Sequence, residues 1–320
     1  MLRLAYISMN ITKEDIDKEL GNLRNLVSKF HGDFCDFELC NGYILQATRN
    51  YFDSRKFSDG IVIFTKKLYG DNFVVVTSAG TNRAENIYTV AKELFENSSK
   101  HVVIKNVGKE LESRLLKLGC RHYRVDEWWD DQSKYDDNSF PEQILNAKQS
   151  TSLDGPNYKS LREECARFNR GYQIEVKRWN ICNPEMTKEL LKKWVDNMHI
   201  RNDWDKNELH ASHEMFCNSR EDLIHFGVYD SKNDKLIGFM VFSEVSSKCL
   251  GYNVLVSDFE YKNLYRVLML EGAKIANSLG YQYLNVQGSE DTNQYLSKRR
   301  LQSEFEIPKE HLIFDEEGCV

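Results

Sequence analysis

The order of predicted strands and helices in the second half of the chain constrains its fold most. A two-strand hairpin, a third strand, a long amphipathic helix and a fourth strand are predicted over residues 225–229, 235–245, 250–256, 262–279 and 281–286. In the long helix, apolar residues recur at helical spacing, and Gly280 follows its end. Strands that alternate with helices form an open sheet with helices packed on it. We therefore expect an α/β (α+β) fold with a mixed central sheet.

The first half of the chain repeats this order of elements without a residue-level repeat. Helices are predicted in the first half over residues 11–30, 81–95 and 109–118, and strands over 41–48, 60–66, 72–78, 101–104 and 121–125. In the second half, further helices are predicted over 141–148, 157–170, 184–198, 206–217 and 291–299, and strands over 172–179 and 310–314. Two units are therefore expected, residues 1–130 and 131–320, with a polar, acidic connector at 127–140.

Composition and residue spacing exclude several classes of protein. The eight cysteines contain no C-x-x-C pair, which is typical of reduced thiols in the cytoplasm. His210 and His213 are three residues apart but lack a second ligand pair, so no metal site is predicted. The net charge of −6 disfavours general nucleic-acid binding. No signal peptide and no apolar run of about 18 residues is recognised, so we expect a cytoplasmic protein without a transmembrane segment.

Two local sequences carry a family resemblance. NYKSLREECARFNR at residues 157–170 resembles a helix with the pattern K-x-R-N-x-x-x-R-F, and YQYLNVQGSEDTNQYLSKRRLQSEFEIP at 281–308 resembles a strand, an N-x-x-x-x-x-D turn, a helix and an L-R-K-x-K end. Both patterns belong to the domain at the C-terminus of phosphatidylglycerol lysyltransferases. The element order over 173–314 also resembles the GNAT acyltransferase fold.

The resemblance implies tandem GNAT-like acyltransferase domains with mixed central sheets. Members of the family resemble enzymes that move an aminoacyl group from aminoacyl-tRNA to an acceptor such as a lipid headgroup, and related tandem GNAT proteins use other acceptors or acyl-CoA. The implied partners are therefore the acceptor end of an aminoacyl-tRNA and a small-molecule, peptide or lipid-headgroup acceptor. No cofactor is implied beyond the donor substrate, which is aminoacyl-tRNA or acyl-CoA.

The segment before the long helix bears on the choice of donor. A CoA-dependent GNAT usually carries the pattern R/Q-x-x-G-x-G/A there, because glycines let backbone amides approach a pyrophosphate at the helix N-terminus. This chain reads SDFEYKNLYRVLML, with no glycine between Gly251 and Gly272. The sequence therefore favours aminoacyl-tRNA over acetyl-CoA.

Candidate catalytic residues lie at and beyond the strand that ends near Val286. Tyr295, on the following short helix, would protonate the leaving oxygen, although it also suits a half-buried packing position. Glu290 and Asp291 would bind a substrate ammonium or, alternatively, cap the short helix. Asn285 and Gln287 alternate along the strand and would position a carbonyl, a role that ordinary polar residues at a sheet edge imitate in sequence.

Basic residues mark candidate phosphate contacts. Arg162 and Arg167 lie on the helix over 157–170, where they would meet a tRNA end or a headgroup, or simply form a solvated helix face. Lys298 and Arg300 form a second cluster where the family's end motif falls. Arg266, at the start of the long helix, would meet an anionic donor.

Three functions remain open from the sequence. The first is acyl or aminoacyl transfer from an activated ester to an amine or hydroxyl, without a covalent enzyme intermediate. The second is acetyl-CoA-dependent N-acetylation with a degenerate phosphate loop. The third is a catalytically inactive GNAT-like binding scaffold.

Overall fold

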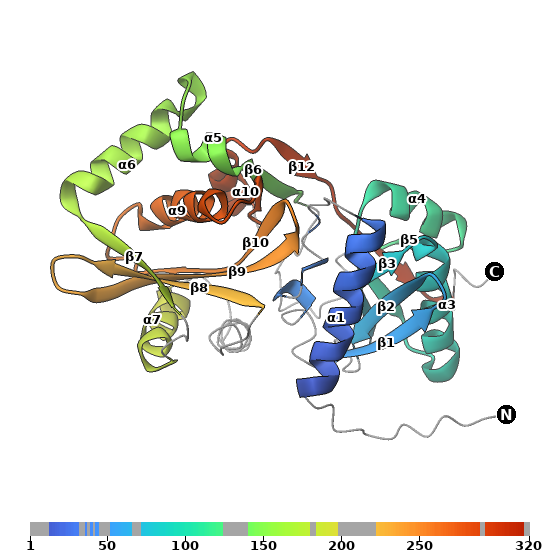
Figure 1. Ribbon diagram of the computed structural model, residues 1–320. Coiled ribbons are helices and arrows are strands. Elements are labelled where there is room, and N and C mark those ends of the chain that lie inside the picture. The colour runs from blue at the N-terminus through green and yellow to red at the C-terminus, as the bar shows by residue number, and fades with distance from the viewer. Residues whose placement is uncertain are drawn as a thin grey trace.

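The computed structural model consists of two units, each built on a mixed sheet with helices on both faces (Figure 1). The structure describes residues 13–31, 36, 39–40, 42–44, 52–65, 72–123, 140–179, 184–197, 222–288 and 292–316. Mixed sheets in two successive units confirm the predicted fold class.

The first sheet has the strand order β1-β2-β3-β4-β13-β5. Its strands are β1 (Phe52–Phe57), β2 (Gly60–Thr65), β3 (Phe73–Gly80), β4 (Val102–Val107), β5 (Arg121–His122) and β13 (Glu310–Phe314). Helix α1 (Lys13–Phe30) packs on one face, and α3 (Arg83–Ser98) with α4 (Lys109–Lys117) packs on the other. Strands β3 and β4 are parallel, and the long helix α3 is the crossover between them.

The second sheet has the strand order β12-β6-β11-β10-β9-β8-β7. Its strands are β6 (Glu142–Asn146), β7 (Ile174–Trp179), β8 (Leu223–Asp230), β9 (Lys235–Ser246), β10 (Cys249–Ser257), β11 (Tyr283–Asn285) and β12 (Phe305–Ile307). Its helices are α5 (Ala147–Ser152), α6 (Lys159–Gly171), α7 (Pro184–Asn197), α9 (Leu264–Ser278) and α10 (Thr292–Arg299). Helices α5, α6 and α9 lie on one face, and α7 lies on the other (Figure 1).

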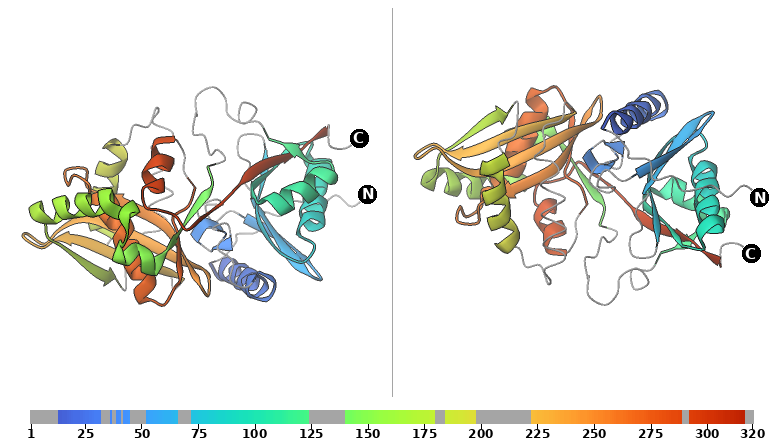
Figure 2. Two further views of the ribbon diagram at one scale, coloured as in Figure 1. Left: turned by 90° about the horizontal axis from the view of Figure 1, so that it is seen from above. Right: turned by 90° about the horizontal axis from the view of Figure 1, so that it is seen from below.

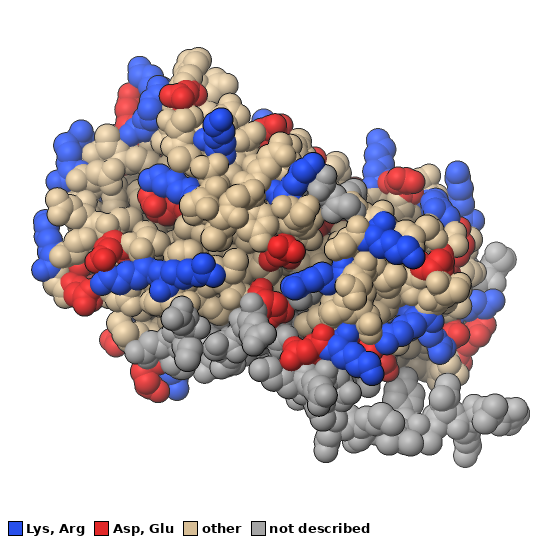
Figure 3. Space-filling model, viewed as in Figure 1, with Lys and Arg blue, Asp and Glu red and all other residues tan. Residues whose placement is uncertain are grey.

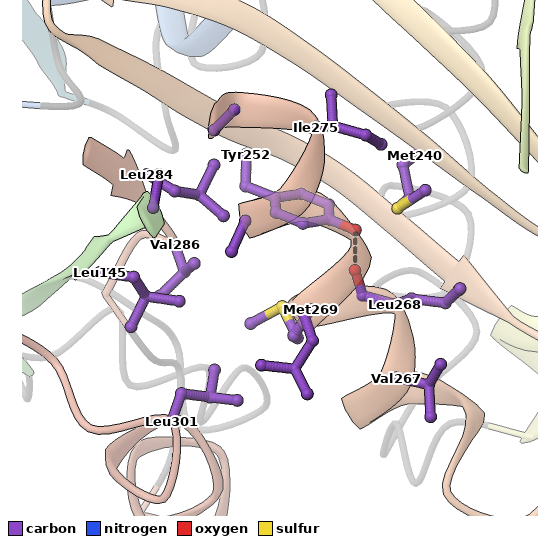
Figure 4. Packing of buried hydrophobic residues seen from close by; sticks show 14 of the residues in the cluster. Leu145, Met240, Tyr252, Val267, Leu268, Met269, Ile275, Leu284, Val286 and Leu301 are labelled. Carbon is purple, nitrogen blue, oxygen red and sulfur yellow. Dashed lines mark hydrogen bonds between the residues drawn. The ribbon is translucent and has the colours of Figure 1, made fainter. Parts of the chain in front are cut away.

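The main core of the second unit lies between the sheet and helix α9 (Figure 4). Tyr252 projects from β10 into this core, and its hydroxyl donates to the carbonyl oxygen of Leu268 at 3.3 Å. That bond satisfies a phenol that would otherwise be buried without a partner. The core therefore fixes α9 directly against β10, the strand that leads into the candidate site.

One strand crosses from one unit to the sheet of the other. Strand β6, the first strand of the second unit, lies between β11 and β12 of the second sheet. Strand β13 lies between β4 and β5 of the first sheet, although it follows the second unit (Figure 2). We predicted a strand at 310–314 as the last element of the second unit, and its assignment to that unit is wrong. Its buried residues Leu312 and Phe314 complete the core of the first unit instead.

Two other predicted elements differ from the structure. Residues 42–44 are helical, where a strand over 41–48 was predicted. The predicted helix over 141–148 begins as strand β6, because Ile144 and Leu145 are buried on opposite faces of the second sheet. The predicted helix over 206–217 lies outside the described residues.

His31 joins the end of α1 to β3 and gives the first unit a testable pH dependence. Its Nε2 accepts the Gly80 N–H at 3.3 Å, which requires the neutral ring. Burial, and then the charge of Arg83, lowers the pKa of His31 to about 4. In the unfolded chain, His31 takes up a proton near the usual histidine pKa of about 6.5. The stability that the neutral ring contributes is therefore fully present above a pH of about 6.5. It is lost as the pH falls from about 6.5 to about 4.

We expect His31→Gln, which keeps an acceptor that does not titrate, to flatten this part of the stability profile. Urea unfolding of both proteins at several pH values between 4 and 7 measures the difference. Parallel profiles would contradict the assignment.

Candidate functional site

The candidate site lies where strands β10 and β11 diverge. The two strands pair in parallel over three residues each, and Gly251 opposite Asn285 is the last pair. Strand β10 continues to Ser257, and a bulge leaves Asn253 without a partner in the pairing with β9. Two parallel neighbours that separate in this way expose backbone groups between them to a substrate or to other side chains.

Asn285 ends β11 at this divergence, and Gln287 lies two residues beyond the strand, whereas both were predicted on it. Asn285 is fully buried; its Nδ2 donates to Glu142 Oε2 at 2.7 Å, and its Oδ1 accepts the Gln287 N–H at 2.7 Å. Gln287 adopts a left-handed backbone with φ of 64°. Its side-chain Nε2 donates to the Tyr252 carbonyl at 2.5 Å and approaches the Asn253 carbonyl at 3.3 Å. The side chain of Gln287 therefore bridges the two diverging strands.

Gln143 connects this divergence to Tyr295. The Gln143 backbone N–H donates to the Gln287 carbonyl at 3.3 Å, and its side-chain Nε2 donates to the Tyr295 carbonyl at 3.5 Å. The Gln143 Oε1 atom is buried and has no hydrogen-bond partner among the described residues. A buried polar atom in that state is available to a ligand or a water molecule.

Tyr295 lies half-buried beside this group. Its ring stacks on Phe140 with centroids 5.1 Å apart, and its hydroxyl lies 3.3 Å from Glu306 Oε1. Arg299 lies against the same ring, 5.7 Å from its centroid. The structure thus brings Tyr295 into the same region as Asn285 and Gln287, with its hydroxyl directed to a carboxylate on β12.

Lys298 is buried, and its ammonium group donates to the Gly288 carbonyl. This contact joins helix α10 to the backbone that follows β11, and the phosphate-binding role of Lys298 stays a prediction. Glu290 and Asp291, the predicted ammonium ligands, lie outside the described residues.

The segment before α9 is occupied by a cluster of two carboxylates and two lysines. Asp258 is buried, and its Oδ1 accepts the Glu260 N–H at 3.0 Å. Lys193 lies 3.0 Å and Lys235 lies 3.2 Å from the Asp258 carboxylate, and both also approach Glu260. Burial raises the pKa of Asp258, but the Glu260 amide and the two lysines outweigh it and lower the pKa below its usual value. The two lysines nearest the segment before α9 are therefore already paired with carboxylates of the chain.

The first unit shows a related arrangement before its long helix α3. Asp59 accepts hydrogen bonds from the Thr81 hydroxyl at 2.5 Å and from the Asn82 N–H at 3.1 Å. These bonds, led by that from Thr81, lower the pKa of Asp59. In both units an aspartate of the chain accepts a backbone N–H near the start of the long helix.

The predicted basic residues do not converge on the divergence. Arg266 forms an ion pair with Glu164 of α6, and Arg162 donates to the carbonyls of Leu153 and Gly155. Arg167 and Arg300 have exposed side chains. On the face shown in Figure 3, basic and acidic side chains are interspersed over both units.

Sequence reasoning missed four residues of this region. Glu142, Gln143 and Asn253 lie on strands whose register decides which side chains meet, and Asp258 stands in the glycine-free stretch before α9, where no local pattern marks it. The pair of polar residues at the start of β6, before an apolar run, is the only local signal for two of them.

Among the described residues there is no group of three or more side chains that would hold a metal ion. No described helix combines the length and the apolar character that crossing a bilayer requires.

Comparison with known proteins places the chain in a family. The model of the phosphatidylglycerol lysyltransferase C-terminal family matches residues 28–302. The chain belongs to this family. No curated protein sequence matches it.

Solved structures of similar fold include L-PGS from Bacillus licheniformis, with a TM-score of 0.62 at 12% identity over 92% of this chain and 91% of that chain. FemX matches with a TM-score of 0.60 at 12% identity over 97% of this chain and 98% of that chain. A tandem GNAT protein from the clavulanic acid biosynthesis pathway matches with a TM-score of 0.53 at 10% identity over 94% of each chain. At these identities the likeness shows the fold, and it confirms the expected tandem GNAT-like architecture.

Proposed function

We propose that this phosphatidylglycerol lysyltransferase C-terminal family member transfers an aminoacyl group from an aminoacyl ester, with aminoacyl-tRNA as the donor, to an amine or hydroxyl acceptor. The family match and the fold shared with L-PGS and FemX support aminoacyl transfer in general. A lipid headgroup, a peptide and a small molecule are the candidate acceptors.

The observation that carries the choice of donor is the Asp258 cluster. The two lysines nearest this segment, Lys193 and Lys235, are already paired with Asp258, which also accepts the Glu260 N–H. A pyrophosphate would have to compete with carboxylates of the chain for these lysines, and the segment lacks the glycines that let backbone amides approach a phosphate. An aminoacyl ester needs no pyrophosphate contact there, so it agrees better with this geometry than acyl-CoA does.

The proposed reaction is a direct displacement at the ester carbonyl. The acceptor nitrogen or oxygen forms a bond to the carbonyl carbon and loses a proton, and the bond from that carbon to the tRNA ribose oxygen breaks. The ribose oxygen leaves as a hydroxyl after it takes a proton. In the proposal, Tyr295 or a water molecule supplies that proton, and Gln143, Asn285 and Gln287 provide the polar groups around the ester.

The donor is tested by incubating the protein with aminoacyl-tRNA labelled in the aminoacyl group and, separately, with labelled acyl-CoA. Acceptor mixtures of lipids, peptides and amines are added to each. We expect label to leave aminoacyl-tRNA faster than by spontaneous hydrolysis and to appear on one acceptor class. Consumption of acyl-CoA alone would reverse the choice of donor, and consumption of neither would refute transfer.

The role of Tyr295 makes a separate prediction. Tyr295→Phe removes the hydroxyl and keeps the ring that stacks on Phe140. If the hydroxyl supplies the proton, kcat is expected to fall about 100-fold, in the range of general acid catalysis. Tyr88→Phe, in the core of the first unit, is the matched control and should leave kcat unchanged. An unchanged kcat in Tyr295→Phe would assign the proton transfer to water.

One observation favours a second candidate, an inactive binding scaffold. Gln287 already bonds to the carbonyls of Tyr252 and Asn253, so a side chain of the protein fills the divergence of β10 and β11. A scaffold would bind aminoacyl-tRNA or an acceptor without accelerating transfer. Equilibrium binding measured beside the transfer assay separates the two functions.

A further inference from the structure

A buried charged cluster lies between the two units, at the start of β6 and the connection that leads into β13. Lys309 is in the short connection between β12 and β13, and its Nζ lies 2.9 Å from Asp36 Oδ1 and 3.6 Å from Glu142 Oε1. The side chains of Lys309, Asp36 and Glu142 are 4%, 7% and 7% exposed. Asp36 belongs to the first unit, and Glu142 begins the strand that enters the second sheet. At this burial, the ion pairs with the lysine offset part of the cost of burying each carboxylate.

The cluster continues into the candidate site. The other Glu142 oxygen, Oε2, accepts from Asn285, and Asn285 in turn accepts the N–H of Gln287. Gln287 holds a left-handed backbone, a conformation that a residue with a side chain keeps only where its surroundings fix it. A chain of contacts therefore runs from Lys309 through Glu142 and Asn285 to Gln287.

The first unit also touches the opposite side of the divergence. Cys40 lies four residues after Asp36, and its Sγ accepts from Asn253 Nδ2 at 3.8 Å. The Asn253 Oδ1 accepts from the Ser243 hydroxyl at 2.7 Å, which fixes the bulge. Gly42 packs so closely that a Cβ there would lie 2.0 Å from Asn253 Nδ2. Thus Cys40 and Gly42 of the first unit contact the β10 side directly, and Asp36 reaches the β11 side through Lys309.

We propose that the first unit is a positioning element for the candidate site of the second unit, and that Lys309 is the positioning residue that connects them. Lys309 ties Asp36 to Glu142, and through Asn285 it fixes Gln287 between the diverging strands. The first unit then contributes no reacting group of its own. This proposal rests on the proposed function only where kcat is measured; the alkylation and hydrogen-exchange measurements described below do not.

An apolar cluster offers the alternative explanation for the contact between the units. Cys40, Ile144, Val245 and Cys249 pack together at the same junction. If this packing alone holds the units, removal of the Lys309 charge will leave Cys40 and Gln287 undisturbed. The two explanations therefore differ in what happens at residues that Lys309 does not touch.

Cys40 is a built-in reporter of the junction. It is fully buried, and burial raises the pKa of its thiol to about 11, so the native protein should protect it from alkylation. Alkylation rates of individual cysteines are measured by peptide mass spectrometry. Hydrogen exchange of the peptide over 284–288 reports on the Gln287 amide. Buried Cys120, in the core of the first unit, shows whether that unit stays folded.

In Lys309→Met we expect Cys40 alkylation and exchange over 284–288 to rise about ten-fold, while Cys120 stays protected. Lys274→Met, at an exposed lysine paired with Glu271 on α9, is the matched control and should change neither. If Lys309→Met exposes Cys120, the first unit of that variant has unfolded. The same two measurements on Asp36→Ala then test the proposal. That variant removes the anchor that holds Lys309 to the first unit. Cys40 alkylation should then rise, and exchange over 284–288 should rise because Lys309 no longer holds Glu142 in a fixed place.

For a donor that the unaltered protein uses, kcat is expected to fall about ten-fold in Lys309→Met, because a displaced site loses alignment. Failure of all donors would refute the proposed function, while alkylation and exchange still decide the positioning role. Unchanged Cys40 alkylation in Asp36→Ala would overturn the proposal. The proposal would also be overturned if Lys309→Met raised Cys40 alkylation but left exchange over 284–288 unchanged. The contact between the units would then have no effect on the position of Gln287.

Discussion

Replacing Asn285 by aspartate is expected to lower the free energy of unfolding by about 3 kcal/mol near neutral pH, within the range for an uncompensated buried charge. The Asn285 Nδ2 donates to Glu142 Oε2 at 2.7 Å, so the substitution places two carboxylates in direct contact. Both positions are buried, and Glu142 already shares Lys309 with Asp36. The Gln287 turn and any transfer activity should be lost with the bond.

The same substitution should add a pH dependence of known sign. Two adjacent buried carboxylates retain a proton, so the folded pKa of the pair lies above the unfolded value. The destabilisation is therefore fully present above that folded pKa and is relieved as the pH falls through it. Urea unfolding at pH 5 and pH 7.5 measures the effect, with Asn285→Ala as the uncharged control. Equal losses for both variants at both pH values would contradict the charge explanation.

Phe314→Ala is expected to destabilise the first unit by about 3–5 kcal/mol, the usual loss for a large buried aromatic. Phe314 is fully buried on β13 and makes edge contacts with the rings of Tyr88 and Phe95, at 5.4 and 5.8 Å between centroids. The cavity would open between β13 and helix α3, although the residue lies near the far end of the chain.

The measurement for Phe314→Ala is hydrogen exchange during urea unfolding, followed in peptides of both units. Peptides of β3, β4 and α3 should lose protection at lower urea than in the unaltered protein. Phe305→Ala, on β12 at 40% exposure, is the control and should shift unfolding little. Equal effects of the two substitutions would show that β13 does not complete the core of the first unit.

The spacing of apolar and turn residues along the chain was sufficient to predict many of the helices and strands. The apolar spacing over 262–279 predicted α9, and the polar turn at Asn233 and Asp234 predicted the hairpin of β8 and β9. The strand at 310–314 was also predicted, but its partners were not, because residues 310–314 show the same apolar pattern in either sheet. The strand over 142–146 was missed because tertiary pairing overrides the helical propensity of its flanking residues.

The site was predictable only in part. The spacing of Asn285 and Gln287 predicted two side chains on one strand, but Gln287 lies beyond β11 and bonds to the carbonyls of Tyr252 and Asn253. The missing glycines drew attention to the segment before α9, where the Asp258 carboxylate meets Lys193 from α7 and Lys235 from β9, 65 and 23 residues away in sequence. Arg266 was expected to meet a donor, but Glu164, 102 residues away, pairs with it. Contacts across such distances are set by packing, which one sequence does not display.

The late position of β13 has a consequence for synthesis of the protein. Strand β5 pairs with β13. When synthesis reaches residue 122, strands β1 to β5 of the first sheet are complete, but β13 has not yet been made. Nearly two hundred residues follow before residue 310, and at about 5–20 residues per second this takes roughly 10–40 seconds. During that time the apolar strand Val102–Val107 has an unpaired edge, the kind of surface that pairs with other chains. The nascent chain must therefore be shielded along this edge until its last strand arrives.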